Sequence, residues 1–204
     1  ETMNSAIPHW RDAGPQRRVG VCLEILARWE AITFENAYAT MHTGGQAFML
    51  AFAGSGAASL ERGLEGLAYA HHAMSAIPPE ATYERAFGRG PKTRLRKTYR
   101  LIPRGVAAVV TCASYPAWNA YPAILANLAT GNPVVLKPHP GTILPMALAV
   151  DAGRAVLEHE GFDPNLLTLA ADTREAPLTQ DLLTHSAIAI VDFTGSQSFG
   201  RWIE

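Results

Sequence analysis

Two short segments place polar groups where predicted strands end. Lys137 closes the apolar run at 133–136, and the tetrapeptide F-T-G-S at 193–196 closes the run at 187–193. A glycine allows close approach of the backbone, a serine offers a hydroxyl, and a helix start presents unpaired N–H groups, so the tetrapeptide predicts a phosphate-binding turn. Ser196 is equally consistent with an ordinary helix N-cap. A glycine-rich G-x-G-x-x-G fingerprint is absent.

Lys137 and the pair Trp118-Asn119 are further candidates for chemistry. In an open α/β sheet, ligands bind beyond the carboxyl ends of the strands, so Lys137 is predicted to face a crevice, although many such lysines are only solvated. Trp118-Asn119 follows the apolar run at 106–111. The Asn119 amide could donate a hydrogen bond to a developing oxyanion, or this could be a turn-forming asparagine beside a packed tryptophan.

The cysteines and histidines give weaker signals. Cys22 lies on a helical stripe and Cys112 in a predicted core strand, so both are predicted to be buried small apolar residues and not nucleophiles. The histidines show no metal-ligand spacing with cysteine or acidic residues, so no metal site is predicted.

The elements that must position these residues fall into two regions. Helical periodicity marks residues 17–90, with segments at 46–53 and 60–76 and a break at Pro78-Pro79. The first helical stripe is predicted to be Val19, Cys22, Leu23, Leu26, Trp29 and Ile32. Residues 93–102 are charged and alternate loosely, as an exposed or edge strand would.

From Gly105 onward, short apolar runs alternate with helical segments, which is typical of a parallel sheet covered on both faces. The predicted strands are 106–111, 133–136, 166–170 and 187–193, and the predicted helices are 121–130, 144–159 and 177–185. Gly131 and Gly161 stand where helix C-caps are expected.

The predicted fold class is therefore α/β: an N-terminal helical segment followed by an incomplete, Rossmann-like doubly wound parallel sheet. The expected divisions are a helical region at 1–92, a strand at 93–104 and the first part of a nucleotide-binding domain at 105–204.

Composition excludes several classes of protein. Of the 204 residues, 48% are apolar and 17% charged, and the net charge is −1, so the chain is globular with no overall attraction to nucleic acid or membrane. Residues 85–104 carry eight Lys or Arg and no acid, but they lack the aromatic interleaving of a nucleic-acid-binding surface and are predicted to be a solvated edge. Two cysteines, no apolar run of about 20 residues and no signal-peptide pattern predict a cytoplasmic protein.

The motifs together resemble the aldehyde dehydrogenase superfamily. They are W-N-A-Y-P at 118–122, L-A-T-G-N-P-V-V-L-K-P-H-P at 128–140 and D-F-T-G-S at 192–196, in this order and on these elements. With H-T-G-G-Q-A-F-M-L-A-F at 42–52 they look like the phenylacetate-degradation branch, the PaaN type.

The resemblance implies a role for each candidate. Asn119 would stabilise the oxyanion during attack on an aldehyde, and Trp118 would line the cofactor cleft through its backbone. Lys137 would hold the adenosine ribose hydroxyls or a 2′-phosphate. Gly195 and Ser196 would meet the pyrophosphate.

Departures from the family pattern affect these roles. The family often places a glutamate three residues after the lysine, where this chain has Pro140. Without that carboxylate, a 2′-phosphate loses a repulsive neighbour, and Lys137 with His139 would favour it. We therefore expect NADP as cofactor, with NAD as the alternative. The spacing around Asn119 is one residue longer than usual, and residues 171–175 replace the usual glycine-containing turn.

The resemblance also implies a cysteine nucleophile and a glutamate base, both downstream of F-T-G-S in the family. Neither Cys22 nor Cys112 is in the matching place. The terminal F-G-R-W-I-E reads as the opening of a helix, so we expect the N-terminal portion of a longer enzyme.

The implied substrate is an aldehyde or semialdehyde of phenylacetate or aromatic catabolism, in some cases CoA-linked, and the strand at 93–104 implies a homo-oligomer. The alternative is a non-catalytic nucleotide-binding or oligomerisation module of the same fold.

Overall fold

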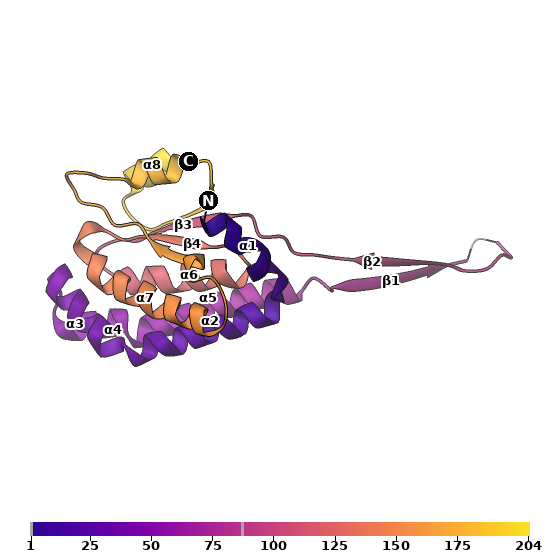
Figure 1. Cartoon of the computed structure of the whole chain (residues 1–204), viewed down its shortest axis with the longest axis horizontal. Coiled ribbons are helices and arrows are strands. Elements are labelled where there is room, and N and C mark those ends of the chain that lie inside the picture. The colour runs from indigo at the N-terminus through magenta and orange to yellow at the C-terminus, as the bar shows by residue number, and fades with distance from the viewer. Residues whose placement is uncertain (1, 87) are drawn as a thin grey trace.

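The computed structural model describes residues 2–86 and 88–204. Helices fill the N-terminal part, an antiparallel hairpin projects from it, and a parallel sheet with its own helices follows (Figure 1). The N-terminal helices are α1 (Thr2–Asp12), α2 (Gly14–Ala31), α3 (Thr33–Gly44), α4 (Phe48–Ser55) and α5 (Ala57–Ser75).

The buried face of α2 is rotated from the predicted stripe. Cys22 and Trp29 are buried as expected, but Leu23 is 43% exposed, and Arg18 lies at the centre of the buried face. Arg18 Nε donates to the carbonyl of Ala129 at 2.8 Å, and its Nη1 donates to the carbonyl of Arg11 at 3.0 Å. A buried arginine that satisfies its donors in this way breaks a pattern based on apolar residues alone.

Two tryptophans of the N-terminal helices tie them to the second half of the chain. Trp10 Nε1 donates to the carbonyl of Leu128 at 2.9 Å, and Trp29 Nε1 donates to that of Ala149 at 2.8 Å. The Trp29 ring also stacks on Tyr121, with ring centroids 3.9 Å apart. These contacts hold the N-terminal helices against the segment at 121–128 and against Ala149, which belong to the second half of the chain.

Helix α5 packs closely along α6 (Pro116–Ala129), and this contact requires a glycine. A Cβ added at Gly66 would lie 2.9 Å from the Cα of Pro122, closer than carbon atoms approach without displacing the backbone. This close approach fixes the position of α6, whose first turns carry Trp118 and Asn119.

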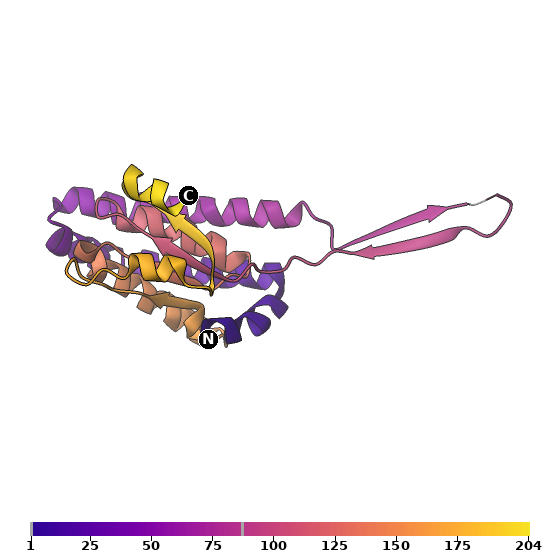
Figure 2. The same ribbon diagram turned by 90° about the horizontal axis from the view of Figure 1, so that it is seen from above.

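The hairpin consists of β1 (Glu80–Arg85) and β2 (Thr93–Thr98), which pair antiparallel with Glu80 opposite Thr98. Both views show it extending away from the helical body (Figures 1 and 2). The strand predicted near 93–102 is confirmed as β2. The division of 1–92 as helical is wrong at β1, because this strand is exposed and charged and has no apolar alternation to reveal it.

The parallel sheet has the strand order β5-β4-β3-β6. Its strands are β3 (Val106–Val110), β4 (Val134–Lys137), β5 (Leu167–Leu169) and β6 (Ile188–Phe193), and its other helical segments are η1 (Pro140–Thr142), α7 (Ile143–His159), η2 (Pro164–Leu166), α8 (Thr179–Thr184) and α9 (Gln197–Ile203). The four strands predicted after Gly105 are thus confirmed to within two residues at each end. Gly131 and Gly161 have φ of 96° and 80°, the left-handed conformation expected after a helix end.

Side chains of β3 alternate between two apolar clusters. Ala107 and Val109 pack with residues of α2, α5, α6 and α7, whereas Val106 and Ala108 pack towards Leu182 of α8. Figure 1 shows the sheet between these layers, with α8 on one side and α6 and α7 on the other. The predicted doubly wound arrangement is therefore confirmed for the described residues.

Candidate functional site

A cavity of about 730 Å³ opens at the carboxyl ends of β3, β4 and β6. The loop after β3 contributes Thr111, Cys112 and Ser114, and the loop after β5 contributes Asp172 and Arg174. Lys137, His139, Gly195 and Ser196 also line the cavity, so the structure brings these four predicted residues together. The position agrees with the rule that open parallel sheets bind ligands beyond their carboxyl edge.

Lys137 is paired with a carboxylate at the base of this cavity. Its Nζ lies 2.8 Å from Oδ1 of Asp172, and both side chains are nearly inaccessible, with 4% and 2% exposed. Nζ also donates to the carbonyl of Pro138 at 2.7 Å. Position 140 carries no carboxylate, as the sequence shows, but Asp172 from another loop places one beside Lys137.

Two buried polar atoms of the cavity residues lack a hydrogen-bond partner among the described residues, Thr111 Oγ1 and Asp172 Oδ1. The contact of Asp172 with Lys137 is an ion pair without hydrogen-bond alignment, so Oδ1 retains a free lone pair. Unsatisfied buried polar atoms are costly, and they are expected where a ligand completes the bonding.

His139 is held in a neutral form. Its Nδ1 accepts a hydrogen bond from the N–H of Gly141 at 3.0 Å. Burial, followed by the positive charges of Arg174 and Lys137, lowers the pKa of His139, against the opposing effect of Asp172. His139 thus adds little positive charge to the cavity near pH 7.

Ser196 is the N-cap of α9, and its Oγ accepts from the N–H of Phe199 at 3.3 Å. The N-cap interpretation is therefore confirmed. Ser196 also lines the cavity, so the two interpretations of this residue do not exclude each other. At Gly195, a Cβ would lie 2.5 Å from the Phe193 ring, so the glycine lets the chain turn tightly around that ring.

Trp118 and Asn119 lie on α6 and line a different hollow, with Arg62, Tyr69 and Asp192. The Arg62 guanidinium lies 5.0 Å from the centroid of the Trp118 ring. Burial raises the pKa of the Asp192 carboxyl. The structure therefore does not bring these two predicted residues into the cavity that holds Lys137.

The Asn119 amide is engaged at the start of α6. Its Nδ2 donates to Cys112 Sγ at 3.0 Å and to the carbonyl of Tyr115 at 2.9 Å. Partial burial would raise the pKa of the Cys112 thiol, but hydrogen bonds from Ser114 and from the backbone near Tyr115 outweigh it, and the pKa is lowered. The prediction that Cys112 is buried is wrong, because β3 ends before it. Cys22 is fully buried, as predicted.

Sequence reasoning missed Thr111, Ser114, Asp172 and Arg174. Thr111 ends a predicted strand and the other three follow one within a few residues, so the strand-end rule that selected Lys137 could have included them. Asp172 lay in a turn that matched no motif, and its contact with Lys137 joins residues far apart in the sequence.

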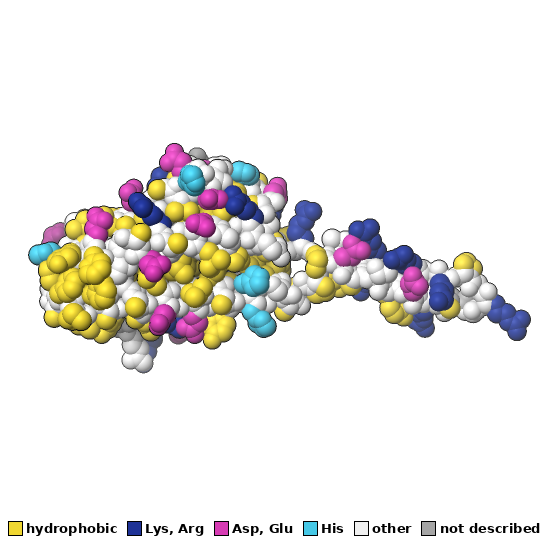
Figure 3. All heavy atoms as spheres, turned by 90° about the horizontal axis from the view of Figure 1, so that it is seen from below, with side chains coloured by type: hydrophobic (Ala, Val, Ile, Leu, Met, Phe, Trp, Pro, Cys, Tyr) yellow, Lys and Arg dark blue, Asp and Glu magenta, His cyan; other side chains and the backbone are white. Residues whose placement is uncertain are grey.

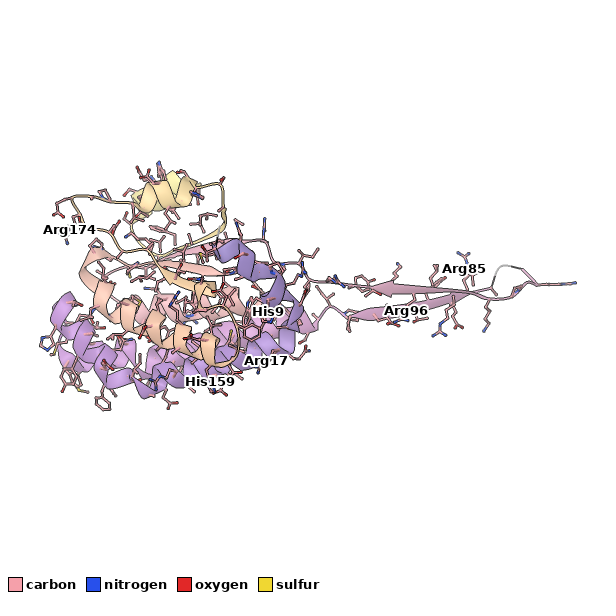
Figure 4. All side chains as sticks on the ribbon, viewed as in Figure 1. His9, Arg17, Arg85, Arg96, His159 and Arg174 are labelled. Carbon is pink, nitrogen blue, oxygen red and sulfur yellow. The ribbon has the colours of Figure 1, made fainter. Side chains whose placement is uncertain are left out.

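Figure 4 labels Arg174 on the loop between β5 and α8; of the six side chains that it labels, Arg174 alone lines the cavity. Among residues 2–86 and 88–204, no group of three or more His, Cys, Asp or Glu side chains is arranged to hold a metal ion. Within the same residues, no helix combines the length and apolar character needed to cross a bilayer.

The family model described as "Aldehyde dehydrogenase family" matches residues 1–204. The chain is similar to a crystal structure of an NAD-dependent aldehyde dehydrogenase from Burkholderia multivorans, with 46% identity and a TM-score of 0.94. The match covers 98% of this chain and 36% of that one. The benzaldehyde dehydrogenase YfmT of Bacillus subtilis is 30% identical over 114 residues, which are 56% of this chain and 22% of that protein.

The fold is also shared with glyceraldehyde-3-phosphate dehydrogenase GapN from Methanocaldococcus jannaschii, solved in complex with NADP. Its TM-score is 0.73 at 16% identity, and the match covers 99% of this chain and 41% of that one. This chain thus spans well under half the length of each of these relatives.

Proposed function

The chain belongs to the aldehyde dehydrogenase family, and from this membership we propose that the native protein oxidises an aldehyde or semialdehyde to the acid, with a nicotinamide dinucleotide as electron acceptor. Aldehyde, water and the oxidised dinucleotide yield acid, the reduced dinucleotide and a proton. This chain contributes part of the cofactor site.

The observation that carries the proposal is the cavity at the carboxyl ends of β3, β4 and β6. Its volume of about 730 Å³ is in the range of small-molecule sites. Two polar atoms of residues that line it, Thr111 Oγ1 and Asp172 Oδ1, have no hydrogen-bond partner among the described residues. The residues present therefore fit a polar ligand such as a dinucleotide. That cofactor supplies the acceptor for the two electrons removed from the aldehyde.

In this proposal Lys137, His139, Gly195 and Ser196 surround the bound dinucleotide. Lys137 meets the ribose, while Gly195 permits close approach to the pyrophosphate and Ser196 offers its hydroxyl. Trp118 lines the cleft on the side of the second hollow. Lys137, His139, Gly195 and Ser196 all line one cavity, which supports placing them around the dinucleotide.

We propose the oxyanion role for Asn119 with one condition. Both Nδ2 contacts are made within the segment from Cys112 to Asn119, so the amide must give up one of them to reach a substrate oxygen. The position of Asn119 near the carboxyl end of β3 supports the role, because the amide needs only to turn on a fixed helix.

We propose an aromatic or phenylacetate-derived aldehyde, free or CoA-linked, as the substrate of a cytoplasmic enzyme. The motif resemblance supports this branch. A benzaldehyde dehydrogenase among the relatives is compatible with an aromatic substrate.

We also propose that the hairpin joins copies of the protein into a homo-oligomer. Tyr83 and Leu95 are more than half exposed on strands that project from the body. Arg94 and Arg96 pair with Glu84 and Glu80 at 3.6 and 2.6 Å. Because both arginines are paired with glutamates, they are less suited to bind the phosphates of CoA. The pairing therefore favours a hairpin that is solvated or in contact with another copy.

The test is an assay of the native polypeptide with aromatic aldehydes, semialdehydes and CoA-linked semialdehydes, following formation of the reduced dinucleotide. Turnover of at least one of these is expected. Nucleotide binding without turnover of any aldehyde would instead favour the non-catalytic module.

Asn119→Ala tests the oxyanion role in the same assay. Removing an oxyanion donor costs about a hundredfold to a thousandfold in kcat, with little change in KM. Asn127→Ala is the matched control, because Asn127 lies on the same helix and its Nδ2 donates to the carbonyl of Ala123 at 2.9 Å. Similar kcat values in both variants would remove Asn119 from the mechanism.

A further inference from the structure

We propose that Asp172 makes this cavity select a dinucleotide whose adenosine ribose carries a free 2′-hydroxyl, NAD, over one that carries a 2′-phosphate, NADP. The proposal rests on the proposed function, since it assumes that the cavity takes a nicotinamide dinucleotide. It reverses the cofactor preference that the sequence suggested.

Asp172 holds a fixed carboxylate in which one oxygen makes an ion pair but no aligned hydrogen bond. The residue is only 8% exposed, and its Oδ2 accepts from the N–H of Leu178 at 3.0 Å. Its Oδ1 lies 2.8 Å from Lys137 Nζ and has no hydrogen-bond partner among the described residues. This atom is almost inaccessible, so a ligand hydroxyl donates to it once the Lys137 side chain shifts, whereas a phosphate monoester is mostly dianionic at neutral pH and is repelled.

Lys137 does not act as a free cation here. Its charge is matched by Asp172, and its Nζ also donates to the carbonyl of Pro138. A phosphate placed on Lys137 would come within a few ångströms of the buried Asp172 carboxylate, and the two like charges would repel in this partly screened site. A ribose hydroxyl fits the pair, since it can accept from Lys137 and donate to Asp172.

His139 and Arg174 do not restore a phosphate site at this pair. The lowered pKa of His139 keeps it neutral, and its Nδ1 is occupied by the N–H of Gly141. Arg174 lines the cavity, but its side chain is exposed on the loop between β5 and α8 (Figure 4). The charge of an exposed guanidinium is screened by salt and water. It attracts the pyrophosphate that NAD and NADP share, so it does not favour either cofactor.

An acidic side chain that accepts from the ribose 2′-hydroxyl is the general device by which nucleotide-binding folds select NAD. The third residue after Lys137 is Pro140, which has no carboxylate. The carboxylate beside Lys137 comes instead from Asp172, in the loop that follows β5.

The experiment measures dissociation constants of the native protein for NAD and NADP by isothermal titration calorimetry, without substrate. Adenosine monophosphate with and without an added 2′-phosphate serves as a second pair of probes. We expect wild type to bind NAD and the unphosphorylated probe more tightly. Asp172→Asn is expected to lower the ratio of the NADP to the NAD dissociation constant about tenfold, since one full negative charge is removed from a partly screened site.

Asp163→Asn is the matched control. Asp163 caps η2 by accepting from the N–H of Asn165 at 2.8 Å, lies outside the cavity, and loses the same charge. It is expected to leave the ratio unchanged, and circular dichroism verifies the fold of each variant. If Asp172→Asn does not fold, the wild-type preference between the two adenosine probes decides.

A wild-type protein that binds NADP as tightly as NAD would overturn the proposal, as would a folded Asp172→Asn variant with an unchanged ratio. In either case binding persists and the proposed function survives. Tighter binding of NADP that is lost in Arg174→Ala would identify Arg174 as a reader of the 2′-phosphate and would also overturn it. Absence of binding by either cofactor would overturn both proposals.

Discussion

Strands β2 and β3 follow one another in the chain but are stabilised by opposite means. Every residue of β3 is buried between two layers, and β3 pairs with both β4 and β6. Every residue of β2 is exposed, and β2 pairs with β1 through a ladder flanked by exposed ion pairs. An isolated two-stranded hairpin is marginally stable in water, so the hairpin has much less support from the described residues than β3 has.

The surface carries the same contrast. In Figure 3, dark blue basic side chains mark the hairpin, and hydrophobic side chains gather at the opposite end of the molecule. The apolar group at α3 and α4 includes exposed Phe34, Tyr38, Met49 and Leu50.

The largest effect is expected when one leucine is truncated in a buried strand and one in an exposed strand. Leu136 in β4 is fully buried, so Leu136→Ala is expected to lower the free energy of unfolding by about 2–5 kcal/mol. Leu95 in β2 is 52% exposed, and Leu95→Ala is expected to change it by no more than about 0.5 kcal/mol. Urea unfolding at low protein concentration measures both. At that concentration copies of the protein are separated, so equal losses would contradict the difference in burial between the two leucines.

A second test compares two thiols: Cys22, which is fully buried in the helical region, and Cys112, which lines the cavity at the carboxyl ends of the strands. Burial raises the pKa of Cys22 to about 12, whereas hydrogen bonds lower that of Cys112. Cys112 is therefore expected to react with a thiol reagent at least about a hundredfold faster than Cys22 in the folded protein.

Labelling of Cys112→Ser and Cys22→Ser separates the two thiols. Fast labelling that survives in Cys112→Ser would contradict the assignment. Saturating dinucleotide is expected to slow the reaction of Cys112, because this residue lines the cavity.

A third test uses pH at the open edge of the sheet. The pKa of His139 is lowered by burial and by Arg174 and Lys137, so its contribution to stability is present above its ordinary pKa of about 6.5 and is lost as pH falls. The melting temperature of wild type should therefore fall below pH 6.5 slightly more than that of His139→Asn. The raised pKa of Asp192 acts in the opposite direction in both proteins, so only their difference is informative. Parallel pH profiles would contradict the prediction.

The smallest expected effect lies in the hairpin. Arg96 and Glu80 form an ion pair at 2.6 Å, with 71% and 43% of their side chains exposed. A double-mutant cycle of Arg96→Gln and Glu80→Gln should give a coupling of about 0.2–1 kcal/mol, screened by salt. A larger coupling that resists salt would show that the pair is buried in an assembly.

The comparison also explains which elements could be predicted from sequence. The strands of the parallel sheet were predictable because burial on both faces selects continuous apolar, β-branched runs. Strand β1 was not, since an exposed strand leaves no such pattern. Helix α2 was predictable in extent but not in orientation, because a buried arginine interrupts its apolar face.

The candidate site divides in the same way. Lys137, Gly195 and Ser196 were predictable because their positions follow from strand ends in the sequence. The pairing of Lys137 with Asp172 was not, because it depends on how two separate loops fold towards each other. The hydrogen bond from Asn119 to Cys112 likewise depends on where α6 begins.

The projecting hairpin has a practical consequence for handling the protein. Its connecting segment lies far from the helical body (Figure 2) and includes two exposed basic residues, Arg89 and Lys92. Exposed loop tips are preferred sites of proteolytic nicking, so trypsin is expected to cut there first. The two fragments would remain associated through the buried core, and protection of this tip would report assembly without any measurement of mass.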